Sequence, residues 1–184
     1  MEAPALNAAQ YLNQDSGIVD YYTPAWIVEA AREVMGGIDL DPASSPIANA
    51  RVQAQRYFTE AEDGLSQPWA GRIWLNHPFG RGANARWIDK LVEEFNAGNV
   101  TQACCITYAS TSEQWFRPLM HFPICWLHGR TNYLLPDGTI KRGVTKGSCV
   151  TYMGPNVRAF GRAFSPHGTV MLPYAPGLRT SPNL

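Results

Sequence analysis

The stretch Arg72-Ile73-Trp74-Leu75-Asn76-His77-Pro78-Phe79 decides how the rest of this 184-residue chain is interpreted. Its first four residues form a short, mostly apolar run that predicts a buried β-strand. The asparagine and the proline that follow predict that the strand stops at Asn76. In open α/β sheets, ligands bind just beyond the carboxyl ends of the strands. The stretch therefore predicts a strand whose end carries polar side chains toward a ligand.

A second loop of this kind lies earlier in the chain. Ile38-Asp39-Leu40 predicts a short strand, and Asp41-Pro42-Ala43-Ser44 follows it as a polar loop. Before them, Tyr22-Thr23-Pro24 opens a helix, with Thr23 predicted as its N-cap and Pro24 at its first helical position. Gly36-Gly37 is predicted to end that helix.

The remaining sequence alternates between segments with the hydrophobic spacing of a helix and segments with that of a strand. Helices are predicted over 46–55, 84–96, 111–120 and 157–164, and strands over 57–59, 72–75, 103–108, 124–127, 131–135, 148–153 and 169–172. Such alternation is typical of an α/β fold. We expect one sheet that is largely parallel, with an antiparallel C-terminal part.

Composition excludes several classes of protein. Hydrophobic residues make up 45% and charged residues 16%, which is typical of a globular protein. No run approaches the ~18 apolar residues of a membrane span, and the first residues lack a secretory signal, so we expect a cytoplasmic protein. The cysteines are predicted to be buried free thiols and no metal site is expected, because they lie in apolar runs without zinc-ligand spacing: Cys104, Cys105, Cys125 and Cys149.

The zero net charge hides an asymmetry along the chain. Residues 1–114 contain seven Lys and Arg against fourteen Asp and Glu, a balance of −7. Residues 115–184 contain eight against one, a balance of +7. This segregation favours a polyanionic partner for the C-terminal part. The alternative is that folding interleaves the two halves and cancels the field.

The loop from Asn76 to Phe79 suits methylation of a base amine. An exocyclic base nitrogen is a poor nucleophile because its lone pair is delocalised into the ring. Asn76 can accept one N–H through its side-chain oxygen, and His77 can accept the other through its main-chain carbonyl. Pro78 stiffens the loop, and Phe79 can stack on a base that has left the duplex. A simple strand-ending turn is the alternative when the loop is considered alone.

The order of the motifs favours the first interpretation. The chain resembles the amino-methyltransferases of DNA, whose catalytic loop reads Asp/Asn-Pro-Pro-Tyr/Phe, and looks most like the compact phage and prophage DNA N6-adenine methyltransferases. The similarity runs from Tyr21 to Pro173 and rests on an ordered series: Tyr22-Thr23-Pro24, Leu40-Asp41-Pro42-Ala43-Ser44, Asp63-Gly64-Leu65, Trp69, Asn76-His77-Pro78-Phe79, Trp87, the strand CCITYAS, Trp115-Phe116 and Gly129-Arg130. The resemblance implies a single-domain, Rossmann-like methyltransferase sheet, S-adenosylmethionine as cofactor and double-stranded DNA as substrate.

The resemblance also implies a set of cofactor-binding residues. Thr23 and Pro24, next to Tyr22, match a Thr-Pro that helps to hold the methionine carboxylate. Asp41 and the loop Pro42-Ala43-Ser44 match the segment that lies against the methionine and ribose, and Asp39 is either a second ligand or the partner of a basic residue. Asp63 and Leu65 match an Asp-x-Leu that touches the cofactor adenine; a solvated acidic loop is the alternative.

Two departures from the family pattern stand out. The loop that begins at Asp41 has no glycine, and His77 stands where proline is usual. Histidine adds an imidazole that titrates near neutral pH, so His77 can tune the choice of base, take part in proton removal or mark reduced activity. N4-cytosine methylation, methylation of RNA or protein glutamine, and a degenerate fold that only binds DNA or a partner remain as alternatives.

Basic residues after the loop and in the C-terminal part are predicted to hold DNA phosphates, because an extruded base requires a duplex held by its backbone. They are Arg81, Arg86, Arg130, Lys141, Arg142 and Lys146. The last three lie on a predicted hairpin with a basic tip over 136–148.

We expect a flexible arm over 1–20, the methyltransferase domain over 21–173 and a loose tail over 174–184. No separate recognition domain fits, so short specificity, a homodimer or both are expected, in the host cytoplasm if a phage encodes the protein.

Overall fold

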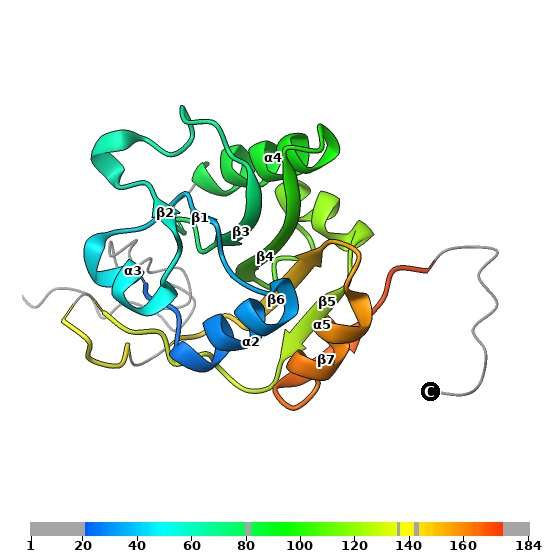
Figure 1. The fold of residues 1–184 in the computed structure, drawn as a ribbon. Helices are drawn as coiled ribbons and strands as arrows, with labels where there is room; N and C mark the ends of the chain where they lie inside the picture. Colours follow the sequence, from blue (N-terminus) through cyan, green and yellow to red (C-terminus); the bar gives the residue numbers. More distant parts are fainter. Residues whose placement is uncertain (1–20, 80–81, 136, 142–143, 175–184) are drawn as a thin grey trace, which may run out of the picture.

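The structure is a computed structural model and describes residues 21–79, 82–135, 137–141 and 144–174 (Figure 1). These residues form a seven-stranded sheet in the order β2-β1-β3-β4-β6-β5-β7. The first four strands in this order run parallel, and each remaining pairing is antiparallel, which confirms the predicted α/β sheet. The strands are β1 Leu40–Asp41, β2 Arg56–Tyr57, β3 Gly71–Leu75, β4 Val100–Tyr108, β5 Ile124–Leu127, β6 Ser148–Met153 and β7 Gly168–Met171.

Helices cover both faces of the sheet. The α-helices are α2 Ala25–Met35, α3 Pro46–Val52, α4 Ala83–Asn96 and α5 Val157–Phe164, and the 3₁₀ helices are η1 Glu60–Glu62 and η2 Gln114–His121. Helices α2 and α5 pack together on one face, and α4 and η2 on the other (Figure 1). No helix among the described residues is long and apolar enough to cross a membrane.

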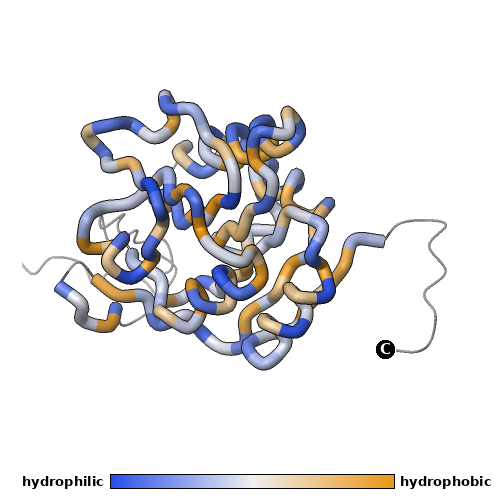
Figure 2. Tube along the Cα trace, viewed as in Figure 1, coloured by the Kyte–Doolittle hydropathy of each residue, from blue (hydrophilic) through white to orange (hydrophobic). Residues whose placement is uncertain are grey.

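The two faces bury two separate hydrophobic clusters. On β3, Trp74 faces the cluster that includes α2 and α5, while Ile73 and Leu75 face the cluster beneath α4. All three side chains are fully buried, as expected for a central strand with alternating side chains. Hydrophobic and hydrophilic residues alternate along α2 and α5, as required of helices with one buried face (Figure 2). The four cysteines are free and buried, as predicted.

Three local predictions were wrong. The N-cap of α2 is Pro24, with φ −55° and ψ 144°, and Thr23 makes no capping hydrogen bond. The 111–120 helix is a 3₁₀ helix that begins at Gln114 and contains Pro118, which lacks the N–H that an α-helix needs. The segment 131–135 is not a strand, because Leu134 pairs only in isolated bridges with Tyr22 and Ile140.

The predicted hairpin over 136–148 is also irregular. The Leu135 N–H donates to the Thr139 carbonyl oxygen at 2.8 Å, and the Lys141 N–H donates to the Tyr133 carbonyl oxygen at 2.8 Å. Arg142 lies outside the described residues, as do Arg81, the predicted arm over 1–20 and most of the predicted tail. The domain limits and the homodimer stay predictions.

An ion pair joins the strands β1 and β3 at their amino ends. Asp39 accepts hydrogen bonds from Arg72 Nε at 2.9 Å, Arg72 Nη2 at 2.6 Å and the Arg72 backbone N–H at 2.8 Å. Arg72 Nη1 also donates to the Gly36 carbonyl oxygen at 2.6 Å, at the end of α2. These hydrogen bonds hold the pKa of the Asp39 carboxyl below its usual value. The pair therefore ties one helix and two strands together.

We expect Asp39→Asn to lower the free energy of unfolding at pH 7 by about 1–2 kcal/mol, because charge-assisted hydrogen bonds are lost from a partly buried pair. The loss should shrink as pH falls below about 4, because the unfolded chain takes up a proton on this carboxyl there and the stabilisation is lost as pH approaches the lower pKa of the folded state. Urea unfolding at pH 7 and pH 3 measures both effects. The control is Glu29→Gln, which breaks the exposed Glu29–Arg32 pair and should change stability by less than about 0.5 kcal/mol. Equal losses in the two variants would contradict this role for Asp39.

Candidate active site

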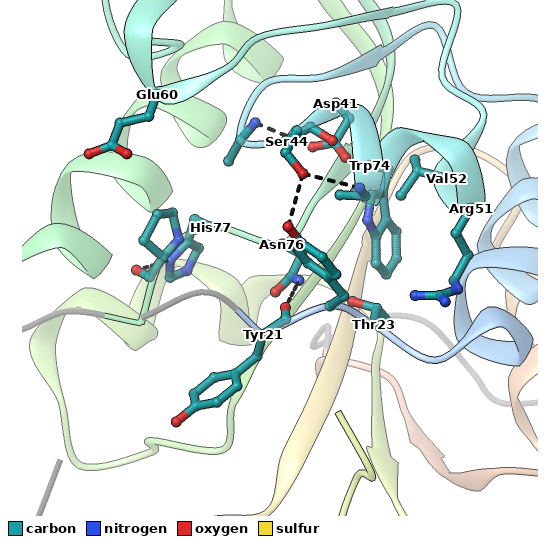
Figure 3. Close-up of a pocket in the computed structure, with 15 residues that line it drawn as sticks. Tyr21, Thr23, Asp41, Ser44, Arg51, Val52, Glu60, Trp74, Asn76 and His77 are labelled. Atoms are coloured by element: carbon teal, nitrogen blue, oxygen red, sulfur yellow. Dashed lines mark hydrogen bonds between the residues drawn. The ribbon is translucent and has the colours of Figure 1, made fainter. Parts of the chain in front are cut away.

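Three segments meet at the carboxyl ends of β1 and β3. These strands are parallel neighbours, so the loops that follow them lie at the same edge of the sheet. Together with the segment before α2, they enclose a cavity of about 300 Å³ (Figure 3). This volume is in the range of small-molecule sites. The position is the one predicted from the two strand-ending loops.

The cavity brings together predicted residues from all three segments. These are Tyr22, Thr23, Asp41, Ala43, Ser44, Asn76, His77 and Pro78. It also has lining residues that sequence reasoning missed: Tyr21, Ser45, Ala48, Arg51, Val52, Glu60 and Trp74. Arg51 reaches the cavity because Ser45 caps α3 directly after the β1 loop, its hydroxyl accepting the Ala48 N–H at 3.1 Å. The sequence signal that could have pointed to Arg51 is a basic residue within residues 1–114, the acidic part of the chain.

Several predicted residues do not line this cavity. Asp39 has the structural role just described, and the structure favours that alternative over a second ligand. Asp63 is exposed, and Leu65 packs against the hydrophobic cluster beneath α4. Between them, Gly64 lies so close to the Pro42 carbonyl oxygen that an added Cβ would be 1.9 Å from it. The turn at 63–65 therefore supports the β1 loop from outside. Pro24, Pro42 and Phe79 also lie outside the lining.

Asn76 presents an oriented hydrogen-bond acceptor. Its Nδ2 donates to the Tyr21 carbonyl oxygen at 2.6 Å. A carbonyl oxygen can only accept, so the atom facing it must be the amide nitrogen. The amide oxygen Oδ1 is left on the other side, buried and without a hydrogen-bond partner among the described residues. A buried acceptor of this kind in a cavity lining is suited to a ligand N–H.

His77 presents a second acceptor for a similar reason. Its side chain is 1% exposed, and Nδ1 lies 3.0 Å from the Pro78 carbonyl oxygen. Nδ1 must therefore carry the proton. Burial lowers the pKa of His77 to about 4, so the ring is neutral at pH 7 and Nε2 is an acceptor. Nε2 is buried and has no partner among the described residues.

Asp41 is the buried acid of the cavity. Burial raises the pKa of Asp41 to about 7 and outweighs the opposite effects of the Ser44 side chain and of the Ala43 N–H, which donates to one carboxylate oxygen at 3.2 Å. A bound cation would favour the charged carboxylate. The hydroxyl of Thr23 is also buried in the lining without a partner in the described part of the chain. The cavity thus offers an acid, a cation in Arg51 and several unused polar atoms.

An aromatic cluster lies beside the cavity. The Phe79 ring centroid is 4.5 Å from that of Tyr108, 5.9 Å from that of Tyr133 and 5.5 Å from that of His77. Lys141 Nζ lies 5.7 Å from the ring centroid of Tyr21 and Lys146 Nζ 5.4 Å from that of Tyr108. Two of the predicted DNA-binding cations therefore lie next to the predicted catalytic loop. Arg86 and Arg130 are exposed.

The sheet order, the cavity at its carboxyl edge and the acceptor on Asn76 define a methyltransferase-like α/β domain. The model of the family described as DNA N-6-adenine-methyltransferase (Dam) matches residues 14–157, and the chain belongs to this family. Family membership confirms the resemblance inferred from the motifs. The comparisons with curated proteins and with solved structures found no match to the chain.

Asp41 and His77 should give opposing pH dependences of stability. Between about pH 4 and pH 7 the folded state keeps a proton on Asp41 that the unfolded chain has lost, so the Asp41 contribution lowers stability as pH rises. Between about pH 4 and pH 6.5 the unfolded chain protonates His77 and the folded state does not, so the His77 contribution raises stability as pH rises. At full size the two effects are on the order of 4 and 3 kcal/mol and nearly cancel.

We therefore expect Asp41→Asn to become more stable relative to the wild type as pH rises from 4 to 7, and to reveal a stability that increases with pH. His77→Leu should reveal the opposite slope. Urea unfolding across this range measures both, with Ser66→Ala, at an exposed serine, as the control. Parallel pH profiles for all four proteins would contradict the shifted pKa values of Asp41 and His77.

Proposed function

We propose that the protein is an S-adenosylmethionine-dependent DNA N6-adenine methyltransferase that acts on a base extruded from the duplex. The observation that carries the proposal is Asn76 Oδ1, a buried acceptor fixed by the Asn76–Tyr21 hydrogen bond at the edge of the sheet where the cavity lies. Family membership supports adenine N6 as the acceptor of the methyl group.

The chemistry of the amine explains why Asn76 matters. When Asn76 Oδ1 and the His77 main-chain carbonyl accept the two N–H groups, the nitrogen becomes more tetrahedral and its lone pair more nucleophilic. Because Asn76 is held in place before substrate binds, this geometry needs little reorganisation. No strong base is required, since the methylated amine loses its extra proton readily to solvent.

The cavity fits the cofactor in charge and in polar groups. S-adenosylmethionine supplies a methyl group made electrophilic by its sulfonium, and it carries an ammonium, a carboxylate and a ribose. Arg51 would pair with the carboxylate, and Asp41 would stabilise the neighbouring positive charge. Glu60 would accept from the ribose hydroxyls, and Thr23 would use its hydroxyl, which has no partner among the described residues.

The aromatic cluster and its lysines supply the DNA side of the proposal. The Phe79 ring, supported by Tyr108 and Tyr133, offers a stacking surface for an extruded base. Lys141 and Lys146 would bind phosphates on either side of that nucleotide. This arrangement brings the acidic cavity and the basic segment together, which explains the segregation of charge along the chain.

Mass spectrometry of nucleosides from the DNA of cells that express the protein tests the function. We expect N6-methyladenine with the wild type and none above background with Asn76→Ala, because the acceptor for the amine is lost. Binding of S-adenosylhomocysteine to the variant, measured by calorimetry, should survive. N4-methylcytosine as the product would move the target to cytosine.

The control is Asn96→Ala, an exposed position at the far end of α4. It should retain full methylation. If Asn76→Ala methylates DNA at the same rate as the control, Asn76 is not needed for methyl transfer and the assignment is wrong.

Lys141→Glu combined with Lys146→Glu should weaken duplex binding at least tenfold at about 50 mM salt, and less at about 300 mM, because phosphate contacts depend on counterion release. Fluorescence anisotropy of a labelled duplex measures the effect. Arg158→Glu combined with Arg162→Glu makes the same charge change on exposed positions of α5 and should weaken binding much less. Equal losses in the two pairs would point to net charge alone.

A further inference from the structure

His77 carries an acceptor that the proposed methyl transfer does not use. The two acceptors of the target amine are Asn76 Oδ1 and the His77 main-chain carbonyl, so the imidazole is additional. Its Nδ1–H is held by the Pro78 carbonyl oxygen, which fixes Nε2 as an acceptor. Nε2 is buried, lies in a side chain that lines the cavity, and has no partner among the described residues. A donor on a bound ligand would satisfy it.

The polar groups of the cavity indicate which ligand donor this is. Figure 3 shows Glu60 and His77 on one side of Asn76, and Thr23 and Arg51 on the other. The cation at the Arg51 end suits the carboxylate of the methionine half. The methyl group must meet the amine near Asn76, in the middle. The adenosyl half then falls at the end that holds Glu60 and His77.

We propose that His77 accepts, at Nε2, a hydrogen bond from the adenosyl half of the cofactor and so selects for that half. The inference rests on the proposed function, since it takes S-adenosylmethionine as the ligand. The donor is the 6-amino group of the adenine or a hydroxyl of the ribose, the two kinds of donor in that half. Proline, the usual residue at this loop position in the resembling enzymes, has no side-chain acceptor. His77 therefore adds a contact to the loop without replacing its acceptors for the target base.

Calorimetric binding to the full-length protein tests the contact without turnover. The probes are S-adenosylhomocysteine, its analogue with hydrogen in place of the 6-amino group, and its analogues that lack the 2′- or the 3′-hydroxyl. Wild-type protein should bind one of these analogues about tenfold more weakly than the parent, because a buried acceptor is then left without its donor. The analogue whose loss is absent from the His77 variants identifies the donor, because a loss that comes from a ribose contact with Glu60 stays the same in those variants.

The same titrations with His77→Leu and His77→Pro complete the test. Both variants should bind the parent about tenfold more weakly and show no further loss with the identifying analogue. The matched control is Thr151→Val on β6, outside the cavity lining, which removes another buried oxygen without a partner among the described residues and should behave as wild type. Analogue penalties that all persist unchanged in the His77 variants, or no penalty with any analogue in the wild type, would overturn the proposal.

Nitrogen-15 NMR of histidine-labelled wild-type protein gives a reading that does not depend on whether the variants fold. His77 should be in the Nδ1–H form, and its Nε2 resonance should move when S-adenosylhomocysteine is added. An Nε2 resonance that stays unchanged at saturation contradicts the contact while leaving the proposed function intact. Failure of the wild type to bind S-adenosylhomocysteine at all would overturn the proposed function and this inference with it.

Discussion

The hydrogen bond from Asn76 Nδ2 to the Tyr21 carbonyl oxygen, 2.6 Å long, joins residues 55 positions apart in the chain. It places the segment that precedes α2 against the end of β3, and so closes one side of the cavity. The same bond decides which way the amide of Asn76 faces. The Tyr21 ring lies between Phe79 and Lys141, so the bond also fixes the edge of the aromatic cluster. The orientation of the acceptor therefore depends on this one contact, and one wall of the cavity and the aromatic cluster adjoin it.

The cavity is a region where the fold does not optimise its own stability. Asp41 is a buried acid, His77 is buried and kept neutral, and the hydroxyl of Thr23 lacks a partner among the described residues. Each of these groups costs free energy that a hydrophobic lining would avoid. Perturbed ionisable groups in a cavity are typical of functional sites. A ligand that carries both donors and positive charge would recover part of this cost.

The sequence was informative where structure is local and buried. Strand β3 was predicted from its apolar run, which the strand needs because it lies at the centre of the sheet. The polar loops after β1 and β3 could then be predicted from where these strands end. Arg51 and Glu60 could not be predicted, since they reach the cavity through the packing of α3 and the turn after β2. The prediction of Thr23 as the N-cap of α2 was wrong because Pro24 occupies the N-cap position. The segment 131–135 has a strand-like pattern but uses its hydrogen bonds outside the sheet.

Strand β3 is held at both ends, by Asp39–Arg72 where it begins and by Asn76–Tyr21 just after it ends. Its five residues are also hydrogen-bonded to β4 along their length. Motion there would break two polar anchors and uncover two hydrophobic clusters at once, so its amides belong with the slowest-exchanging part of the molecule. Helix α3, which also lines the cavity, buries fewer side chains than β3. Motion that admits a ligand therefore comes from the α3 side of the cavity, while the end of β3 that carries Asn76 stays fixed.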